Sequence, residues 1–184
     1  PISDKTSFQA WLQKIEQASL TCIDTETTSL DAMQAELVGI SLSVKVGEAC
    51  YIPVAHRTGE DQLERAWVLA QLKPWLENPN AKKVGQNLKY DIHVLENYQI
   101  AMQGVTHDTL LESYVLESHL SHGMDSLAER HLGIKTIRYE DICGKGVHQF
   151  GFDQVDLKTA TDYAAEDADV TLQLKAILDK ELKK

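Results

Sequence analysis

The sequence predicts an α/β domain built on a mixed β-sheet, and three observations support this fold class. Apolar and polar residues alternate within residues 20–26, 37–46 and 49–54, as they do in strands with two unlike faces. Apolar residues then recur at helical spacing, and short strand-like runs separate the helices that this spacing predicts. Strands first, followed by alternating helices and strands, are typical of a mixed sheet covered by helices.

The first part of the chain is expected to form one helix, three antiparallel strands and a second helix. The N-terminal helix follows two candidate capping residues, Ser3 and Thr6, and carries apolar residues at helical spacing. The three strands come next. A turn at residues 47–48 joins the last two, so we expect an antiparallel meander. Residues 61–76 are expected to form the second helix, which ends before Pro79.

Short strands alternate with helices in the rest of the chain. We expect strands at residues 82–85 and 104–106, a helix capped by Asn87 between them, and a helix from Asp108 to Leu116. The remaining expected elements are a loop at 117–123 with two solvent-exposed histidines, His119 and His122, a helix at 126–132 capped by Asp125, an irregular Gly-rich stretch at 133–155, and a long helix at 156–183.

Composition indicates one acidic globular domain. The chain has 184 residues, 43% of them hydrophobic and 25% charged, which is enough for a core of ordinary size. Its 28 acidic and 18 basic side chains give a net charge of −10, the wrong sign for binding nucleic acid by bulk electrostatics. The ligand is therefore not a polyanion, or cations are recruited locally, or a partner supplies a basic surface.

Cysteine usage and hydropathy indicate a cytoplasmic protein. The three cysteines, Cys22, Cys50 and Cys143, are far apart and match no zinc-binding spacing. An odd number excludes a complete set of disulfides, and a reducing cytoplasm is the natural setting. No apolar run approaches the roughly 20 residues that cross a membrane. The N-terminus also lacks the block that begins a secretion signal. We therefore expect no membrane partner.

Four carboxylates stand where acidic side chains are unusual. Asp24 and Glu26 share one face of the first strand, because strand side chains alternate in direction. Asp91 and Asp167 lie on the apolar stripes of two helices, although buried Asp is rare unless it is paired. The ordinary alternatives are a strand that frays into an acidic loop, and aspartates that act as helix caps or ion-pair partners. Tyr163, one turn before Asp167, offers a hydroxyl but no positive charge.

Gathered together, these carboxylates predict a metal site. Inward carboxylates repel one another and are costly to desolvate, so divalent cations are needed to neutralise them. An all-oxygen set of ligands suits Mg²⁺ or Mn²⁺ better than zinc. Two such ions about 3.5–4 Å apart form the clamp used in phosphoryl displacement.

The same residues resemble the DEDD nucleases of the tyrosine subclass. Asp24-x-Glu26, Asn87-x-x-x-Asp91 and Tyr163-x-x-x-Asp167 match the three exonuclease motifs of that family. Longer stretches narrow the resemblance to the proofreading 3′-5′ exonuclease domain of bacterial DNA polymerase I, a family A polymerase. These stretches are DTET at 24–27, KVGQNLKYD at 83–91, DTLLESY at 108–114, MDSLAER at 124–130 and YAAEDADVT at 163–171.

The resemblance covers essentially the whole chain and implies an RNase H-like fold, a five-stranded mixed sheet flanked by helices. It implies a 3′-5′ exonuclease that uses two divalent metal ions, Mg²⁺ or Mn²⁺, on single-stranded DNA 3′ ends. In that scheme Asp24, Glu26 and Asp167 hold the first ion, and Asp24 and, through water, Asp91 hold the second. Tyr163 would orient the attacking water, with help from Glu26.

The resemblance also implies a set of substrate-binding residues. Leu30 and Tyr139 would pack on the terminal bases, a contact that tolerates any sequence; ordinary packing within the protein is the alternative for both. The residues that would meet the terminal sugar and phosphates are Thr27, Gln86, Asn87 and Tyr90. One departure lies before Met124, where the family often offers an arginine and this chain has a slightly shorter loop with the two histidines.

The likeness further implies that residues 1–184 are the exonuclease domain of a longer chain, with a polymerase domain of the same parent chain as partner. Two other functions fit related motifs: an exonuclease that trims RNA 3′ ends, and a non-catalytic scaffold domain of a polymerase. Some members of the family have lost the carboxylates. All four are present here, which favours an active nuclease.

Overall fold

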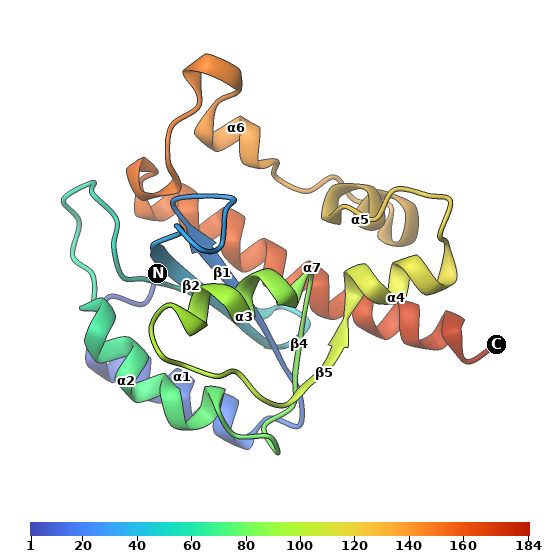
Figure 1. Ribbon diagram of the computed structural model, residues 1–184, viewed down its shortest axis with the longest axis horizontal. Coiled ribbons are helices and arrows are strands. Elements are labelled where there is room, and N and C mark those ends of the chain that lie inside the picture. Colours follow the sequence, from blue (N-terminus) through green and yellow to red (C-terminus); the bar gives the residue numbers. More distant parts are fainter.

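A five-stranded mixed sheet lies at the centre of the computed structural model, which describes residues 1–184 (Figure 1). The strand order is β3-β2-β1-β4-β5. Strands β1 (Thr21–Thr27), β2 (Leu37–Lys45) and β3 (Glu48–Pro53) pair antiparallel, whereas β4 (Lys83–Gly85) and β5 (Val105–Asp108) extend the sheet in parallel from β1. The predicted meander and mixed sheet are both confirmed.

Helices cover both faces of this sheet. In Figure 1, α7 runs along one face, and α1, α2 and α3 lie on the other. No helix is long and apolar enough to span a membrane. The helices are α1 (Lys5–Gln17), α2 (Arg65–Leu76), α3 (Leu88–Glu96), α4 (Thr109–Leu116), α5 (Met124–Leu132), α6 (Tyr139–Cys143) and α7 (Leu157–Leu182), with single 3₁₀ turns at Gly146–His148 and Phe152–Gln154.

Alternation along β1 divides the core into two parts. Ile23 faces α1, α2 and α3 and belongs to the larger apolar cluster of the protein. Its neighbour Cys22 faces α7 and packs with Ala168. Asp24 and Glu26 continue the Cys22 face, because side chains alternate along a strand. The strand therefore presents both carboxylates to α7.

Two helix starts differ from the prediction because of side-chain hydrogen bonds. Helix α1 is capped by Asp4, whose carboxylate accepts from the Ser7 N–H at 2.8 Å, and not by Ser3 or Thr6. Helix α2 begins at Arg65, so residues 61–64 are not helical. There the Gln62 amide bonds both the N–H and the C=O of His56, at 2.9 and 2.7 Å, and fixes an extended approach to the helix.

Two other predicted caps act differently. Asn87 does precede α3, but it adopts a left-handed conformation (φ 57°, ψ 50°) and its side chain makes no capping bond. Helix α5 begins at Met124, one position before Asp125, which lies in its first turn. The Asp125 carboxylate accepts a hydrogen bond from the Thr136 hydroxyl instead, at 2.5 Å.

Asp108 caps two helices at once. Its carboxylate accepts from Leu110 N–H at the start of α4, as predicted, at 2.9 Å. The same carboxylate accepts from the backbone N–H groups of Asn87 and Leu88 at the start of α3, at 2.9 and 2.8 Å. The N-termini of α3 and α4 are therefore joined through one side chain, which fixes the helix that carries Asp91.

Lys83, the first residue of β4, is a fully buried cation. Its ammonium donates to the carbonyl oxygens of Ala81, Gln103 and Asn78, at 2.6, 2.8 and 3.3 Å. It also lies 4.5 Å from the centre of the Trp75 ring. Burial lowers the pKa of Lys83 to about 8. The Asn78 carbonyl also accepts from the Ala81 N–H, whereas Lys83 is the donor found for the carbonyl groups of Ala81 and Gln103.

Replacement of Lys83 should therefore destabilise the fold. We expect Lys83→Met to lower the free energy of unfolding by about 2–4 kcal/mol, because buried carbonyl groups lose their partner. The neighbouring Lys82 is exposed, so Lys82→Met is a matched control that should change stability by less than about 0.5 kcal/mol. Urea unfolding curves of the three proteins would measure this. Equal stability of both variants would contradict a structural role for Lys83.

Candidate active site

Three carboxylates meet where α7 crosses β1. Oxygen atoms of Asp24, Glu26 and Asp167 all lie within 4.8 Å of one another. The crossing is close because α7 presents small buried residues to the sheet, among them Ala164 and Ala168 on either side of Asp167. The predicted inward placement of Asp167 is confirmed by this geometry.

The carboxylates at this crossing have no compensating positive charge. None of the ion pairs in the protein includes Asp24, Glu26 or Asp167. Burial raises the pKa of Asp24 to about 7. Burial, followed by the charge of Asp24, raises the pKa of Glu26 and of Asp167 well above the usual range. The folded protein thus holds these groups close together at an electrostatic cost.

Asp91 lies beside this set but outside it. One of its carboxylate oxygens accepts hydrogen bonds from the Thr25 N–H, at 3.0 Å, and from the Thr25 hydroxyl. Thr25 lies between Asp24 and Glu26 and faces the opposite side of the sheet, toward α3. Asp91 is buried, and burial together with the charge of Asp24 raises its pKa. It is therefore near Asp24 without sharing the three-carboxylate cluster.

The donor set fits a hard divalent cation. It consists of carboxylate oxygens alone, they converge from a strand and a helix, and they have no cation of their own. Oxygen ligands of this kind are those that Mg²⁺ and Mn²⁺ prefer. Asp24, Glu26 and Asp167 are thus the residues suited to hold a metal ion directly.

Tyr163 lies one helical turn before Asp167 and is half-buried. Its ring packs against Phe152 and Tyr139, with centroids 5.8 and 6.2 Å away. Burial, and then the charge of Asp167, raises the pKa of Tyr163 far above its ordinary value. The hydroxyl therefore stays protonated and can serve as a hydrogen-bond donor.

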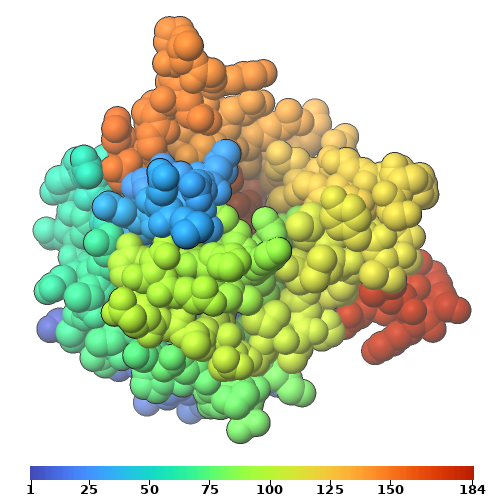
Figure 2. Space-filling model, in the orientation of Figure 1, coloured from blue at the N-terminus to red at the C-terminus, as the bar shows by residue number.

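A groove of about 450 Å³ opens next to Glu26. Figure 2 shows a hollow between the loop that follows β1, in blue, and the segment around α6, in orange. Four predicted substrate residues line the groove: Thr27, Leu30, Tyr90 and Tyr139. The structure thus brings these four side chains together at the carboxylate cluster.

The side chains of this groove differ in how they are held. Leu30 is 97% exposed, so it is not packed within the protein. Tyr139 is half-buried and stacks on Phe152 with ring centroids 6.3 Å apart, so it takes part in ordinary packing as well. The Tyr90 hydroxyl bonds the Thr27 hydroxyl and the Ser29 carbonyl, which fixes the loop that carries Leu30.

Gln86 and Asn87 do not line the groove. The Gln86 amide donates to the His122 carbonyl at 2.8 Å and accepts from the Thr109 hydroxyl, so both of its ends are used within the protein. Asn87 is exposed at the start of α3.

One of the two loop histidines is buried, which corrects the prediction. His119 is exposed as expected, but His122 folds back onto α4. Its Nδ1 lies 2.6 Å from the Ser113 hydroxyl, and its ring packs on Tyr114 with centroids 3.7 Å apart. The loop closes over the helix because this ring finds both a polar and an aromatic partner there.

Sequence reasoning missed the part of the groove wall that comes from residues 149–151, which includes Gln149 and Phe150. It also missed the central position of Phe152, which is fully buried against Tyr139 and Tyr163. A signal was present, because two aromatic residues flank Gly151 in an otherwise polar stretch.

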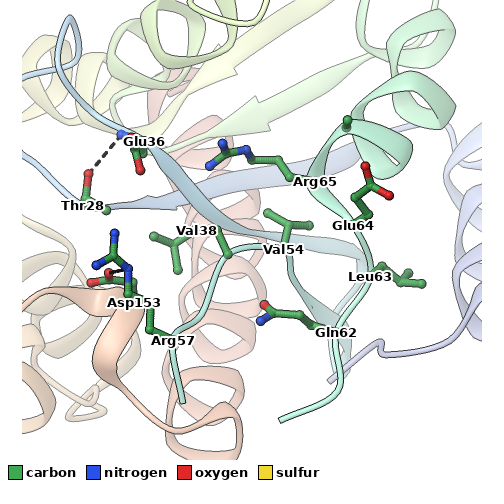
Figure 3. Close-up of a pocket in the computed structure, with 12 residues that line it drawn as sticks. Thr28, Glu36, Val38, Val54, Arg57, Gln62, Leu63, Glu64, Arg65 and Asp153 are labelled. Atoms are coloured by element: carbon green, nitrogen blue, oxygen red, sulfur yellow. Dashed lines mark hydrogen bonds and ion pairs between the residues drawn. The ribbon is translucent and has the colours of Figure 1, made fainter. Parts of the chain in front are cut away.

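A larger hollow of about 580 Å³ lies nearby and is a poorer candidate for the active site (Figure 3). It contains none of the four predicted catalytic carboxylates. Both of its arginines are already engaged: Arg57 pairs with Asp153 at 3.1 Å, and Arg65 donates to the Leu37 carbonyl at 3.2 Å. Chemistry is therefore assigned to the carboxylate cluster and not to the larger volume.

Comparison with known proteins agrees with this geometry. The sequence profile of the 3′-5′ exonuclease family matches residues 1–183. DNA polymerase I of Pseudomonas aeruginosa is 54% identical over 186 residues, which cover 98% of this chain and 20% of that protein. The chain thus spans about a fifth of the length of this relative.

Solved structures with a similar fold include an exoribonuclease and a protein that binds Mg²⁺. Escherichia coli RNase D, an exoribonuclease involved in structured RNA processing, matches with a TM-score of 0.72 and 17% identity over 99% of this chain and 44% of that chain. Brucella melitensis NrnC with bound Mg²⁺ matches with a TM-score of 0.68 and 21% identity over 91% of this chain and 75% of that chain. These likenesses confirm the RNase H-like fold.

The raised pKa values predict an unusual pH dependence in metal-free protein. The folded state binds protons at these carboxylates more tightly than the unfolded state does, so the resulting stability is present at low pH and lost as pH rises through about 7. Urea unfolding in a chelator, from about pH 5.5 to 8.5, should show stability falling with pH.

The diagnostic quantity is the difference between the native protein and Asp24→Asn, which should lose less stability over this range. Glu112 also has a raised pKa, from burial and from Asp179, and contributes in the same direction in both proteins. An identical fall in native protein and Asp24→Asn would show that Asp24 is not under this electrostatic cost.

Proposed function

Because the chain belongs to the family of 3′-5′ exonucleases, we propose that it hydrolyses phosphodiester bonds at the 3′ end of single-stranded DNA and releases nucleotides. The reaction would use two divalent metal ions, Mg²⁺ or Mn²⁺. The observation that carries the proposal is the convergence of Asp24, Glu26 and Asp167 beside an open groove. Carboxylates gathered at such a cost, without a counter-charge, favour a catalytic site over a scaffold.

The carboxylates would bind the two metal ions in two ways, directly or through water. Asp24, Glu26 and Asp167 would hold one ion directly, because their oxygens already face one another. Asp24 and Asp91 would hold the second. Asp91 would do so through water, because one of its oxygens is occupied by Thr25. When bound, such ions lower the pKa of water and stabilise the oxyanion that leaves.

The chain's own side chains would then orient the reacting groups. The protonated Tyr163 hydroxyl would donate a hydrogen bond to the attacking water and hold it in line with the scissile phosphate. Glu26 would hold the same water from the strand side. Phe152 fixes the Tyr163 ring by packing against it.

The groove would hold the terminal nucleotides. The exposed Leu30 side chain and the Tyr139 ring would contact the bases, a contact that tolerates any base. Thr27 and Tyr90 line the same groove and would meet the terminal sugar or phosphate. Gln86 and Asn87 would reach the substrate from the adjacent start of α3, with Asn87 exposed there and the Gln86 amide exchanging its present partners.

Proofreading is the biological role that we propose. The 54% identical relative is a DNA polymerase I, and this chain matches a fifth of it. Residues 1–184 would then act as an exonuclease domain beside a polymerase domain of the same parent chain. The cytoplasm is the proposed compartment, in keeping with three buried cysteines that form no disulfide.

RNA trimming is the second candidate, since Escherichia coli RNase D shares the fold. The two functions differ in the sugar of the preferred substrate. Matched 5′-labelled DNA and RNA oligonucleotides separate them directly. Faster removal of DNA 3′ ends is the result that we expect, and a preference for RNA would favour the alternative.

Loss of a metal ligand should abolish cleavage while the fold persists. We expect Asp24→Ala and Asp167→Ala to reduce digestion of a 5′-labelled single-stranded oligonucleotide by at least about 1,000-fold, because each removes a carboxylate that would hold the metal. Asp162→Ala is a matched control on α7, since Asp162 is exposed and pairs only with Lys158. Undiminished digestion by either cluster variant, with melting curves verifying the fold, would rule out this assignment.

Loss of the Tyr163 hydroxyl should have a smaller effect. Tyr163→Phe keeps the ring packing and the carboxylates but removes the hydrogen bond to water, so we expect a loss of about 10–1000-fold in rate. Tyr114→Phe changes a half-exposed hydroxyl elsewhere and should match the native rate. Single-turnover digestion at saturating Mg²⁺ is the appropriate measurement. A native rate for Tyr163→Phe would reduce Tyr163 to a packing residue.

A further inference from the structure

A second cluster of ligand-type side chains lies far from the catalytic carboxylates. His107 of β5, Glu112 of α4 and Asp179 of α7 each direct one ligand atom to a common point, and these atoms lie within 4.8 Å of one another. Figure 1 shows why they meet, since α4 lies alongside the C-terminal half of α7. Asp179 follows Asp167 by twelve residues on the same helix, roughly 18 Å along its axis.

The spacing of these atoms suits a small metal ion. Nδ1 of His107 lies 3.2 Å from Oε1 of Glu112 and 3.5 Å from Oδ1 of Asp179. A tetrahedral site with metal–ligand bonds of about 2.0–2.1 Å separates its ligands by about 3.3–3.4 Å. The observed separations lie close to this value on both sides of the imidazole.

The Glu112 carboxylate accepts no hydrogen bond from an N–H or hydroxyl group of the protein, and its contact with the Asp179 carboxylate needs a proton between the two. Both of its oxygens are buried, and neither the His107 ring nor any other group donates to them with hydrogen-bond geometry. Burial, and then the charge of Asp179, raises the pKa of Glu112 above its usual value. A buried carboxylate without a donor is costly, and a cation at the common point removes that cost.

The environment of His107 favours the neutral ring. Partial burial lowers its pKa, and the charges of Lys175, Lys183 and Lys82 act in the same direction, while that of Asp179 opposes them. A neutral imidazole can present a lone pair on Nδ1 to a metal ion. With a metal ion bound, the two Nδ1–carboxylate contacts would be contacts between neighbouring ligands.

Asp179 is oriented by a second contact. Its Oδ2 lies 2.7 Å from Nζ of Lys175, and its Oδ1 is the oxygen that faces His107. One oxygen is thus held by a lysine while the other remains available. Outer contacts of this kind commonly orient carboxylates and imidazoles in metal sites.

We propose that His107, Glu112 and Asp179 bind one Zn²⁺ ion at a non-catalytic site that ties β5 and α4 to α7. An imidazole among the ligands favours Zn²⁺ over Mg²⁺, whereas the all-carboxylate cluster has the opposite preference. One chain would therefore carry two sites of different metal selectivity, one that includes Asp167 of α7 and one that includes Asp179 of the same helix.

Direct binding measurements test this proposal without relying on activity. The full chain carrying Asp24→Asn and Asp167→Asn, which weakens the catalytic cluster, is stripped with a chelator and titrated with Zn²⁺ by calorimetry, with metal content measured after gel filtration. Into this background are placed His107→Phe and Glu112→Gln. The matched control is His93→Phe, because His93 and Glu96 form an exposed His–Glu contact at 3.4 Å.

We expect the background protein and His93→Phe to bind one equivalent of Zn²⁺. In His107→Phe and Glu112→Gln the affinity for Zn²⁺ should be at least about 10–100-fold weaker. Zn²⁺ should raise the melting temperature of the background protein, and His107→Phe and Glu112→Gln should lose this rise. Mg²⁺ should not reproduce the rise. No Zn²⁺ binding, or binding unchanged by either variant, overturns the proposal. Glu112→Gln is nearly isosteric, so it keeps the test decisive if His107→Phe unfolds.

A second arm separates this proposal from the exonuclease assignment. Glu112→Gln in the otherwise native chain should digest single-stranded DNA with Mg²⁺ within about twofold of the native rate, since Asp179 lies roughly 18 Å along α7 from Asp167. Loss of digestion in a folded Glu112→Gln protein would place Glu112 in the catalytic machinery and refute a separate site.

Discussion

Repulsion among closely spaced, inward-facing carboxylates is the constraint around which this domain is built. Asp24, Glu26 and Asp167 are held within 4.8 Å of one another with no ion pair to offset their charge. They can be held there only because the framework is rigid. Strand β1 is paired on both sides in the sheet, and α7 packs onto it through small buried residues such as Ala164. The energy of the core is what keeps these charges together.

Polar groups away from the cluster extend this rigidity. Asp108 ties the starts of α3 and α4 together and so holds the helix that carries Asp91. Lys83 donates to three carbonyl groups just before β4 and β5. Lys83 is buried and Asp108 is half-buried, yet each ionisable side chain is hydrogen-bonded to backbone groups. The contrast with the carboxylates of Asp24, Glu26 and Asp167, which have no ion-pair partner, supports the proposal that the latter are functional.

Local patterns were enough to predict the strands, most helices and the inward carboxylates, because alternation and helical spacing report directly which face is buried. They did not predict features set by distant residues. Helix α2 starts late because Gln62 bonds His56, and α3 is capped by Asp108, 20 residues or more away. His122 is buried because its Nδ1 forms a hydrogen bond with the Ser113 hydroxyl. Asp91 lies outside the cluster because Thr25 holds it, which no one-dimensional pattern shows.

Leu30 and Tyr139 were both predicted to pack on the terminal bases, yet they differ in how much the fold depends on them. Leu30 is 97% exposed and supports nothing in the fold, whereas Tyr139 stacks within the aromatic cluster around Phe152. A library of variants selected for folding alone should let position 30 drift freely while it restricts position 139. The same library selected for nuclease activity should restrict both. The difference between the two selections would therefore measure, at position 30, a side-chain preference that comes from substrate contact alone.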